Sequence, residues 1–297
     1  MVIVEFMGGL GNQMFQYAMG RSLSKHLNTT LKFDLNHLLD RTPKENFVFR
    51  DYDLDVFTLS TERASQDEID RFFKQSENKW IRLFRNLIIQ KINPYVVFRE
   101  PHFHYTPVVY DLPPNSYLAG YWQSPKYFEN VKEEIRKDFT FKNGLLPESS
   151  DLAAKIAAVN SVCINVRRAD FVTNTFHGAC DMKYFMPAIE VMASKVETPH
   201  FFLFSDDMKW CEENFKIDKY PLTFVGHEHK GFKFSNYLHL LSLCKHFIIP
   251  NSSFAWWSVW LNGNKDKVVI APKTWLTDPN WDPKDLVSPD WIRIDNG

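Results

Sequence analysis

Two adjacent arginines near the middle of the chain are the residues best suited to bind phosphate. Arg167 and Arg168 come directly after an apolar run at residues 161–166, and Asp170 follows closely. A guanidinium group forms paired, planar hydrogen bonds with phosphate oxygens, and a neighbouring carboxylate can hold it in place. We therefore expect a contact with a diphosphate. An arginine–aspartate pair on the surface is the ordinary alternative.

Apolar runs at residues 200–204 and 246–249 are also followed by polar residues. After the first come Ser205, Asp206 and Asp207; after the second come Asn251, Ser252, Ser253 and Phe254, where a helix is expected to begin. Hydroxyl and amide side chains at a helix start cap it while leaving N–H groups for phosphate oxygens. Carboxylates accept hydrogen bonds from a guanine edge or from ribose hydroxyls. Together with the arginines, these residues predict a nucleotide-diphosphate site.

A glycine-rich loop follows the first predicted strand, at residues 2–6. Its glycines are Gly8, Gly9 and Gly11. Glycines let the backbone approach a ligand, and the helix expected to begin near Asn12 favours negative charge at its N-terminus. Asp34 lies where a dinucleotide-binding fold carries its ribose-binding acid, but Met14 replaces the third glycine of that fingerprint. An NAD(P)-dependent oxidoreductase is therefore a weaker alternative.

Alternating strands and helices must position these residues. In the second half, strands are expected at 161–166, 200–204, 222–225, 246–249 and 267–271, with helices at 184–196, 234–241 and 254–261. In the first half, strands are expected at 2–6, 31–34 and 117–121, and helices after residue 12 and at 62–74, 79–91 and 127–137. This alternation predicts parallel sheets covered by helices, which bind ligands at the carboxyl ends of their strands.

By composition, a linker is expected at the stretch 144–150, which contains glycine, proline and serine. It divides the chain into two predicted domains, 1–147 and 148–297. Residues 40–115 between the better-defined elements of the first domain show less regular patterns, and no motif there identifies a substrate.

Composition excludes several classes of protein. The 297 residues contain 35 basic and 36 acidic side chains, a net charge of −1, so a basic surface for nucleic acid is not expected. The cysteines are Cys163, Cys180, Cys211 and Cys244. Their spacing fits neither a zinc site nor a disulfide scaffold, which favours a reducing compartment. With no leader-like N-terminus and no long apolar helix, a cytoplasmic protein is expected.

Several blocks of this sequence resemble the bacterial α-1,2-fucosyltransferases, glycosyltransferase family 11, which is grouped with the blood-group H enzymes. The blocks are residues 8–18, 120–124, 204–207, 251–257 and 268–272. The His-x-Arg-Arg-x-Asp motif shared with other GDP-fucose enzymes falls on 165–170, where Asn165 replaces the usual His and Ala169 a usual Gly. Asparagine can form hydrogen bonds but carries no charge, so a proton-transfer role at position 165 is not expected.

The resemblance implies a GT-B-like enzyme with two facing parallel-sheet α/β domains, an acceptor-side N-terminal one and a C-terminal one that binds GDP-L-fucose. It implies inverting, metal-independent transfer of L-fucose to the 2-hydroxyl of a terminal β-galactoside, that is, a galactoside 2-alpha-L-fucosyltransferase without a cofactor. Arg167 would stabilise the leaving diphosphate and Asn12 would lie near the reacting hydroxyl. The residues that it implies for donor binding are Gly9, Gly11, Asn165, Arg168, Asp170, Ser205, Asp206, Asp207, Asn251, Ser252, Ser253 and Phe254.

Three points stay open at the level of sequence. The general base is not identified: Glu5, Asp34 and Asp181 are candidates, each expected to be structural, and the D-x-D spacing at 51–55 is expected to be a polar turn. A carbohydrate-binding protein without catalysis is a further alternative. Finally, the basic and apolar residues of 79–91 suit weak peripheral contact with the inner face of a membrane, or a helix packed on the core.

Overall fold

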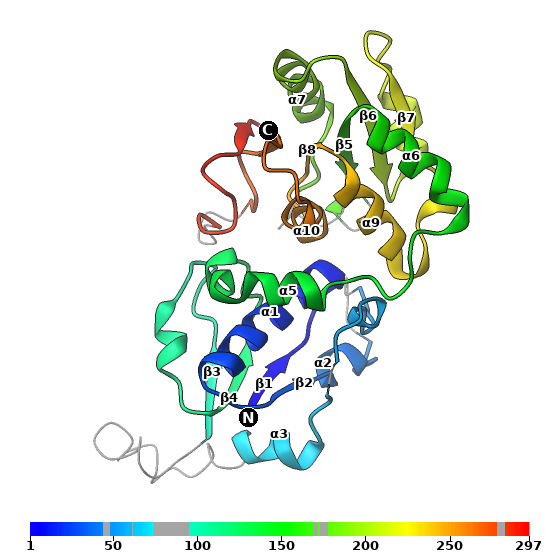
Figure 1. Ribbon diagram of the computed structural model, residues 1–297. Helices are drawn as coiled ribbons and strands as arrows, with labels where there is room; N and C mark the ends of the chain where they lie inside the picture. Colours follow the sequence, from blue (N-terminus) through cyan, green and yellow to red (C-terminus); the bar gives the residue numbers. More distant parts are fainter. Residues whose placement is uncertain are drawn as a thin grey trace. The chain divides into compact units, whose positions relative to one another are not determined.

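Two parallel sheets organise the chain, one in each of two units (Figure 1). In the computed structural model the units are Met1–Thr140 and Phe141–Gly297. The structure describes residues 1–43, 48–60, 62–73, 95–168, 171–172, 178–277 and 283–296. The prediction of two parallel-sheet α/β domains is confirmed. The predicted membrane-contacting helix at 79–91 and Asp170 lie outside the described residues.

The N-terminal unit contains a four-stranded sheet in the order β2-β1-β4-β3, with every pair parallel. Its strands are β1 (Val2–Glu5), β2 (Leu31–Asp34), β3 (Tyr95–Arg99) and β4 (Asn115–Ala119). Its α-helices are α1 (Leu10–His26), α2 (Asn36–Leu39), α3 (Gln66–Phe73) and α5 (Lys132–Asp138). Because β1 is central, its apolar side chains are fully buried, which explains an apolar run without alternation.

The C-terminal unit contains a six-stranded parallel sheet in the order β10-β9-β8-β5-β6-β7. Its strands are β5 (Asn160–Val166), β6 (Pro199–Ser205), β7 (Leu222–Phe224), β8 (His246–Ile248), β9 (Val269–Pro272) and β10 (Ile292–Ile294). Its α-helices are α6 (Ser150–Ala158), α7 (Met182–Lys195), α8 (Met208–Asn214), α9 (Ser235–Leu243) and α10 (Ser253–Leu261). Along the chain, β6 and β7 are added on one side of β5, and β8, β9 and β10 are then added on the other side. The strand order therefore reverses between β5 and β8.

Short 3₁₀ helices connect these elements, at Leu54–Val56, Pro107–Asp111, Pro125–Tyr127, Glu129–Val131, Pro147–Ser149, His227–His229 and Phe232–Phe234. The core of the C-terminal unit forms where α7 covers the sheet. Its buried side chains Tyr184, Phe185, Ala188, Ile189 and Met192 pack with the apolar residues of β5, β6 and β8. Their spacing of three and four positions puts them on one face of this helix, which the sequence predicted at 184–196.

The prediction of a linker at 144–150 was wrong for residues 147–150. Residues 147–149 form a 3₁₀ helix that runs into α6, and Ser149 is fully buried. The hydroxyl of Ser149 accepts a hydrogen bond from Asn236 Nδ2 at 2.9 Å and lies 3.0 Å from Nδ1 of His229. These contacts tie the segment into the C-terminal unit, and the two units divide at Thr140 rather than after residue 147.

All four cysteines are buried free thiols. Within the described residues, no helix combines the length and the hydropathy that crossing a membrane requires.

Candidate active site

The predicted donor-binding segments follow three neighbouring strands of the C-terminal sheet. They come after β5, β6 and β8, which run parallel, with Val166 paired to Ser205 and Ile164 paired to Ile248. Parallel strands end at one edge, so the topology brings the three segments to the carboxyl edge of this sheet. The order of the strands reverses between β5 and β8, and such a reversal is where open α/β sheets bind ligands.

Arg167 and Asp206 form an ion pair at this edge. Nη1 of Arg167 lies 2.7 Å from Oδ2 of Asp206, and their side chains are 27% and 11% exposed. Among the described residues Oδ2 accepts no hydrogen bond of good geometry, although it is buried. The other carboxylate oxygen accepts a hydrogen bond from the backbone N–H of Arg168 at 2.9 Å. Asp206 therefore fixes the turn after β5 and keeps a buried charge beside Arg167.

Arg168 is held by Asp207 and by an aromatic ring. Its Nε lies 3.4 Å from Oδ2 of Asp207, and its guanidinium carbon lies 3.9 Å from the centre of the Trp210 ring. Asp207 also caps α8, because its Oδ1 accepts the N–H of Trp210 at 3.1 Å. Stacking on an indole orients the guanidinium plane. The sequence did not identify Trp210, although an aromatic residue in the first turn after a strand end is a visible signal.

Asn165 and Ser205 are buried at the ends of β5 and β6. Nδ2 of Asn165 donates to the carbonyl of Phe204 at 3.4 Å, and the hydroxyl of Ser205 accepts the N–H of Asp207 at 2.9 Å. Both side chains thus bind neighbouring backbone, which keeps the arginine and aspartate turns in place. The carboxylates predicted to accept from guanine or ribose are paired with the arginines in this structure.

The capping prediction for α10 was wrong. The helix begins at Ser253, one residue earlier than predicted, and the side chain of its N-cap Ser252 makes no capping hydrogen bond. Asn251 is buried outside the helix, where its Nδ2 donates to the carbonyls of Gly178 at 3.1 Å and Trp275 at 3.0 Å. Through these two hydrogen bonds the amide of Asn251 joins the loops at Gly178 and Trp275. Ser253 and Phe254 are half-buried at the helix start.

The remaining predicted residues lie in the N-terminal unit, after β1. Helix α1 begins at Leu10 instead of near Asn12, so Gly11 and Asn12 belong to its first turn and Gly9 is its N-cap. Gly8 has φ +75°, and a Cβ there would lie 2.4 Å from Nδ2 of Asn12. Left-handed backbone at Gly8 therefore allows the loop to be shorter than predicted. Oδ1 of Asn12 accepts a hydrogen bond from Nε2 of Gln123 at 2.9 Å.

Glu100 is a residue that sequence reasoning missed. It directly follows β3, and its carboxylate accepts the backbone N–H groups of Tyr121 and Trp122 at 2.7 to 3.1 Å. Burial raises the pKa of Glu100 to about 7, although these two hydrogen bonds favour the charged form. The strand-like run at 95–98, with an acid two residues after its end, is a signal that could have found it.

The three carboxylates considered as general bases have different surroundings. Asp34 is buried and accepts hydrogen bonds from the hydroxyl of Tyr117 and the N–H of Asn36, both at 2.8 Å. Asp181 caps α7. Burial raises the pKa of Glu5, at the end of β1. The contacts of Asp34 and Asp181 are structural, as expected, and the identity of a base stays open.

The D-x-D spacing at 51–55 lies beside α1. Asp51 forms an ion pair with Arg41 at 2.5 Å, and the carboxamide of Gln13 accepts the N–H of Asp53 and donates to the carbonyl of Asp51, both at 2.8 Å. A turn bound by Gln13 agrees with the expected polar turn. In the part of the chain that the structure describes, no group of three His, Cys, Asp or Glu side chains could hold a metal ion.

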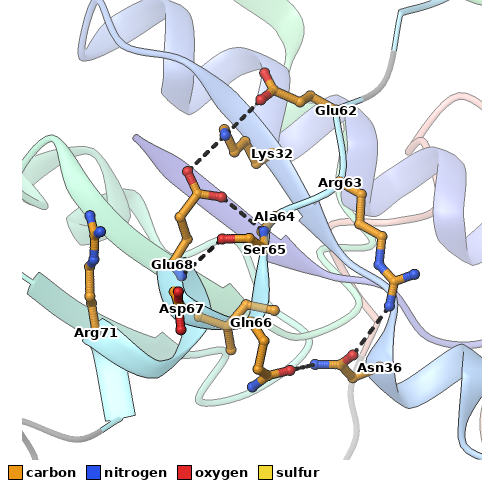
Figure 2. Close-up of a pocket in the computed structure, with 11 residues that line it drawn as sticks. Lys32, Asn36, Glu62, Arg63, Ala64, Ser65, Gln66, Asp67, Glu68 and Arg71 are labelled. Carbon is orange, nitrogen blue, oxygen red and sulfur yellow. Dashed lines mark hydrogen bonds and ion pairs between the residues drawn. The ribbon is translucent and has the colours of Figure 1, made fainter.

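A cavity of about 690 Å³ lies beside β2 and the start of α3 (Figure 2). Lys32 binds Glu62 at 2.6 Å and Glu68 at 2.8 Å, while Glu68 and Ser65 exchange the hydrogen bonds of a capping box. In the lining of the cavity, the side-chain amide of Asn36 donates a hydrogen bond to Gln66 and accepts one from Arg63. None of the described residues that line the cavity was predicted for the site, and its charges mainly anchor α3.

The model of one protein family, Glycosyl transferase family 11, matches residues 1–295 of this chain. The chain belongs to glycosyl transferase family 11. This family 11 chain is 30% identical to an alpha-1,2-colitosyltransferase of Escherichia coli over 99% of each chain. It is 27% identical to the human galactoside alpha-(1,2)-fucosyltransferase 1 over 60% of this chain and 52% of the human one. Family membership makes the protein a fucosyltransferase-like glycosyltransferase and supersedes the oxidoreductase and the non-catalytic alternatives.

A solved structure is similar to the family 11 chain in its fold. It is a mutant of Arabidopsis thaliana FUT1 in complex with GDP, with a TM-score of 0.51 and 12% identity, over 94% of this chain and 72% of that one. At this identity the likeness concerns the fold alone. With the two parallel sheets described above, it identifies the family 11 fold as GT-B-like.

Proposed function

We propose that this chain transfers L-fucose from GDP-β-L-fucose to the 2-hydroxyl of a terminal β-galactoside. The observation that carries the proposal is the pair of arginines after β5, held by Asp206 and Asp207 beside the reversal of the sheet, in a chain of glycosyl transferase family 11. Arginines already oriented by carboxylates can bind a diphosphate without first being ordered. The solved structure in complex with GDP and the human galactoside alpha-(1,2)-fucosyltransferase 1 support this choice.

In the proposed reaction the acceptor oxygen attacks the anomeric carbon of fucose and the bond from that carbon to the β-phosphate breaks. The configuration inverts, GDP leaves with the electron pair, and the hydroxyl proton passes to water or to a base. Negative charge grows on the diphosphate, and Arg167 stabilises it in the role that a metal ion has in other glycosyltransferases. Arg168, stacked on Trp210, binds the same diphosphate. In the N-terminal unit, Asn12 contacts the reacting hydroxyl.

A second donor is favoured by the similarity to an alpha-1,2-colitosyltransferase. Colitose differs from fucose in lacking the 3-hydroxyl group, so the same arginine pair would serve either GDP-sugar. Recognition of the 3-hydroxyl would separate the two donors, because a site built to bind a hydroxyl discriminates strongly against an analogue that lacks it.

The purified chain with GDP-fucose and a panel of terminal β-galactosides tests the proposal. We expect transfer to be abolished when the 2-hydroxyl of the galactose is methylated. Transfer should persist when the methyl group is on a hydroxyl of the acceptor that the enzyme does not contact. GDP-colitose is the matched donor control. Transfer of colitose but not fucose would replace the proposed donor, and transfer to a 2-O-methyl galactoside would overturn the proposed linkage.

A further inference from the structure

The carboxylate of Glu100 binds the turn that follows β4 in the N-terminal unit. Strand β4 ends at Ala119, whose carbonyl accepts the N–H of Glu100 at 2.8 Å. Beyond this point the N–H groups of Tyr121 and Trp122 donate to the Glu100 side chain instead of to a strand. One residue therefore continues the sheet with its backbone and holds the next turn with its carboxylate.

The turn has a conformation that needs such support. Trp122 has φ +56°, which is costly for a residue with a large side chain, and its ring is fully buried. A Cβ on Gly120 would lie 2.4 Å from Cβ of Glu100, so only glycine allows the carboxylate to approach. Strained backbone persists where the surroundings hold it, and it is concentrated at functional sites.

This turn leads directly to Asn12. The residue after Trp122 is Gln123, which donates to Oδ1 of Asn12, and the carbonyl of Gly120 accepts Nε2 of Gln16 from α1 at 3.2 Å. The loop after β1 and the turn after β4 belong to neighbouring strands, and the strand order of this sheet reverses between them. The two contacts thus join both sides of the reversal.

We propose that Glu100 is a positioning residue, whose carboxylate holds the turn at 120–123 so that Gln123 orients the carboxamide of Asn12. Glu100 acts through Gln123 and does not itself contact the substrate. The proposal rests on the proposed function, in which Asn12 contacts the acceptor hydroxyl. The donor-binding residues after β5, β6 and β8 belong to the other unit, so Glu100 affects the acceptor step and leaves the affinity for the donor unchanged.

Kinetics of Glu100→Gln, Gln123→Ala and the double variant test this path. A glutamine turns one of the two oxygens that accept the N–H of Trp122 into an NH₂ donor, which repels that N–H. We expect kcat to fall about tenfold at an unchanged KM for the donor. The double variant is expected to be no slower than the slower single one, because both changes interrupt the same path. Glu68→Gln is the control, since this carboxylate also accepts a backbone N–H but at the start of α3. Effects that multiply in the double variant, or an unchanged kcat in Glu100→Gln, would overturn the proposal.

A measurement that needs no activity separates this proposal from the proposed function. The measurement follows the side-chain amide signals of Asn12 and Gln123 in ¹⁵N spectra, where the signal of Gln123 is assigned by its loss in Gln123→Ala. Both signals should shift in Glu100→Gln. They should stay in place in Glu68→Gln. Shifted signals in a chain that transfers no fucose would refute the proposed function and leave the positioning role. Unshifted signals would refute the positioning role whatever the activity.

Discussion

The two sheets place different side chains at the same topological position. In the C-terminal unit the reversal between β5 and β8 carries two arginines paired with two aspartates. In the N-terminal unit the reversal between β1 and β4 carries contacts between carboxamides and between Glu100 and backbone N–H groups. Oriented positive charge suits a diphosphate, while uncharged donors and acceptors suit a sugar hydroxyl. The fold supplies two equivalent places, and the side chains decide what each can bind.

Arg167→Lys should have the largest effect, because it removes the oriented charge from the C-terminal reversal. An ammonium group cannot form a planar pair of hydrogen bonds with a diphosphate, so we expect kcat to fall by about 10²–10³-fold in a folded protein. The loss should be mainly in kcat, since charge on the leaving group grows toward the transition state. Initial rates with saturating donor measure it.

Arg293→Lys is the matched control for this substitution. Arg293 lies in the same unit but binds the backbone carbonyls of Pro272 and Lys273, at 2.9 and 2.7 Å. Its replacement should change thermal stability more than kcat. A near-normal kcat in Arg167→Lys would remove the diphosphate role from Arg167 and, with it, the contrast between the two units.

The charge of the N-terminal reversal depends on pH through Glu100. Burial raises the pKa of its carboxyl from 4.5 to about 7, so the folded protein holds this proton more tightly than the unfolded chain does. The contribution of Glu100 to stability is therefore fully present below its ordinary pKa and is lost as the pH rises through about 7. A pKa shift of this size corresponds to a decrease of about 3 kcal/mol in the free energy of unfolding.

Urea denaturation of the wild type and of Glu100→Gln across this pH range measures the loss. The free energy of unfolding of the wild type, relative to that of the variant, should decrease as the pH rises from about 4.5 to about 7 and should then level off. A difference that does not change with pH would show that Glu100 has the same pKa in the folded and the unfolded chain, so that the N-terminal reversal carries a full negative charge at neutral pH.

Replacing two neighbouring glycines in the N-terminal unit, Gly8 and Gly9, should have a smaller effect on the free energy of unfolding. Gly8→Ala places a Cβ against Asn12 at φ +75°, so we expect the free energy of unfolding to fall by about 1–2 kcal/mol. At Gly9, φ is −84° and a Cβ would meet nothing within 4 Å. Gly9→Ala should therefore unfold like the wild type. Equal destabilisation of both variants in urea would show that the loop does not depend on the left-handed residue.

Most of the strands were predictable because their signal is local. The apolar runs before Arg167, Ser205 and Asn251 are visible in the sequence, and a parallel sheet brings their ends to one edge. The pairing at that edge was not predictable. Asp206 binds the backbone of Arg168 across 38 positions, and spacing alone favoured Asp170 as the partner of an arginine.

The N-terminal contacts were harder to predict for the same physical reason. The importance of Glu100 depends on a turn 21 positions later, and the strand before it lies in a region whose patterns are irregular. The partners of Asn251 were equally hidden, because its Nδ2 donates to two loop carbonyls that lie 73 and 24 positions away. Residue type indicated chemistry at each of these places, but only the tertiary contacts decide which partner a side chain takes.

Removal of divalent cations should have the smallest effect. If the positive charge for the leaving diphosphate comes from Arg167 and Arg168, then EDTA should leave the initial rate of transfer unchanged. Asp51, the first acid at 51–55, agrees with this expectation because its carboxylate is paired with Arg41. A rate that collapses in EDTA and returns with Mg²⁺ or Mn²⁺ would mean that a metal ion shares the task of the arginines. Asp53 and Asp55 would then be the first residues to replace, and the charged chemistry would no longer belong to the C-terminal unit alone.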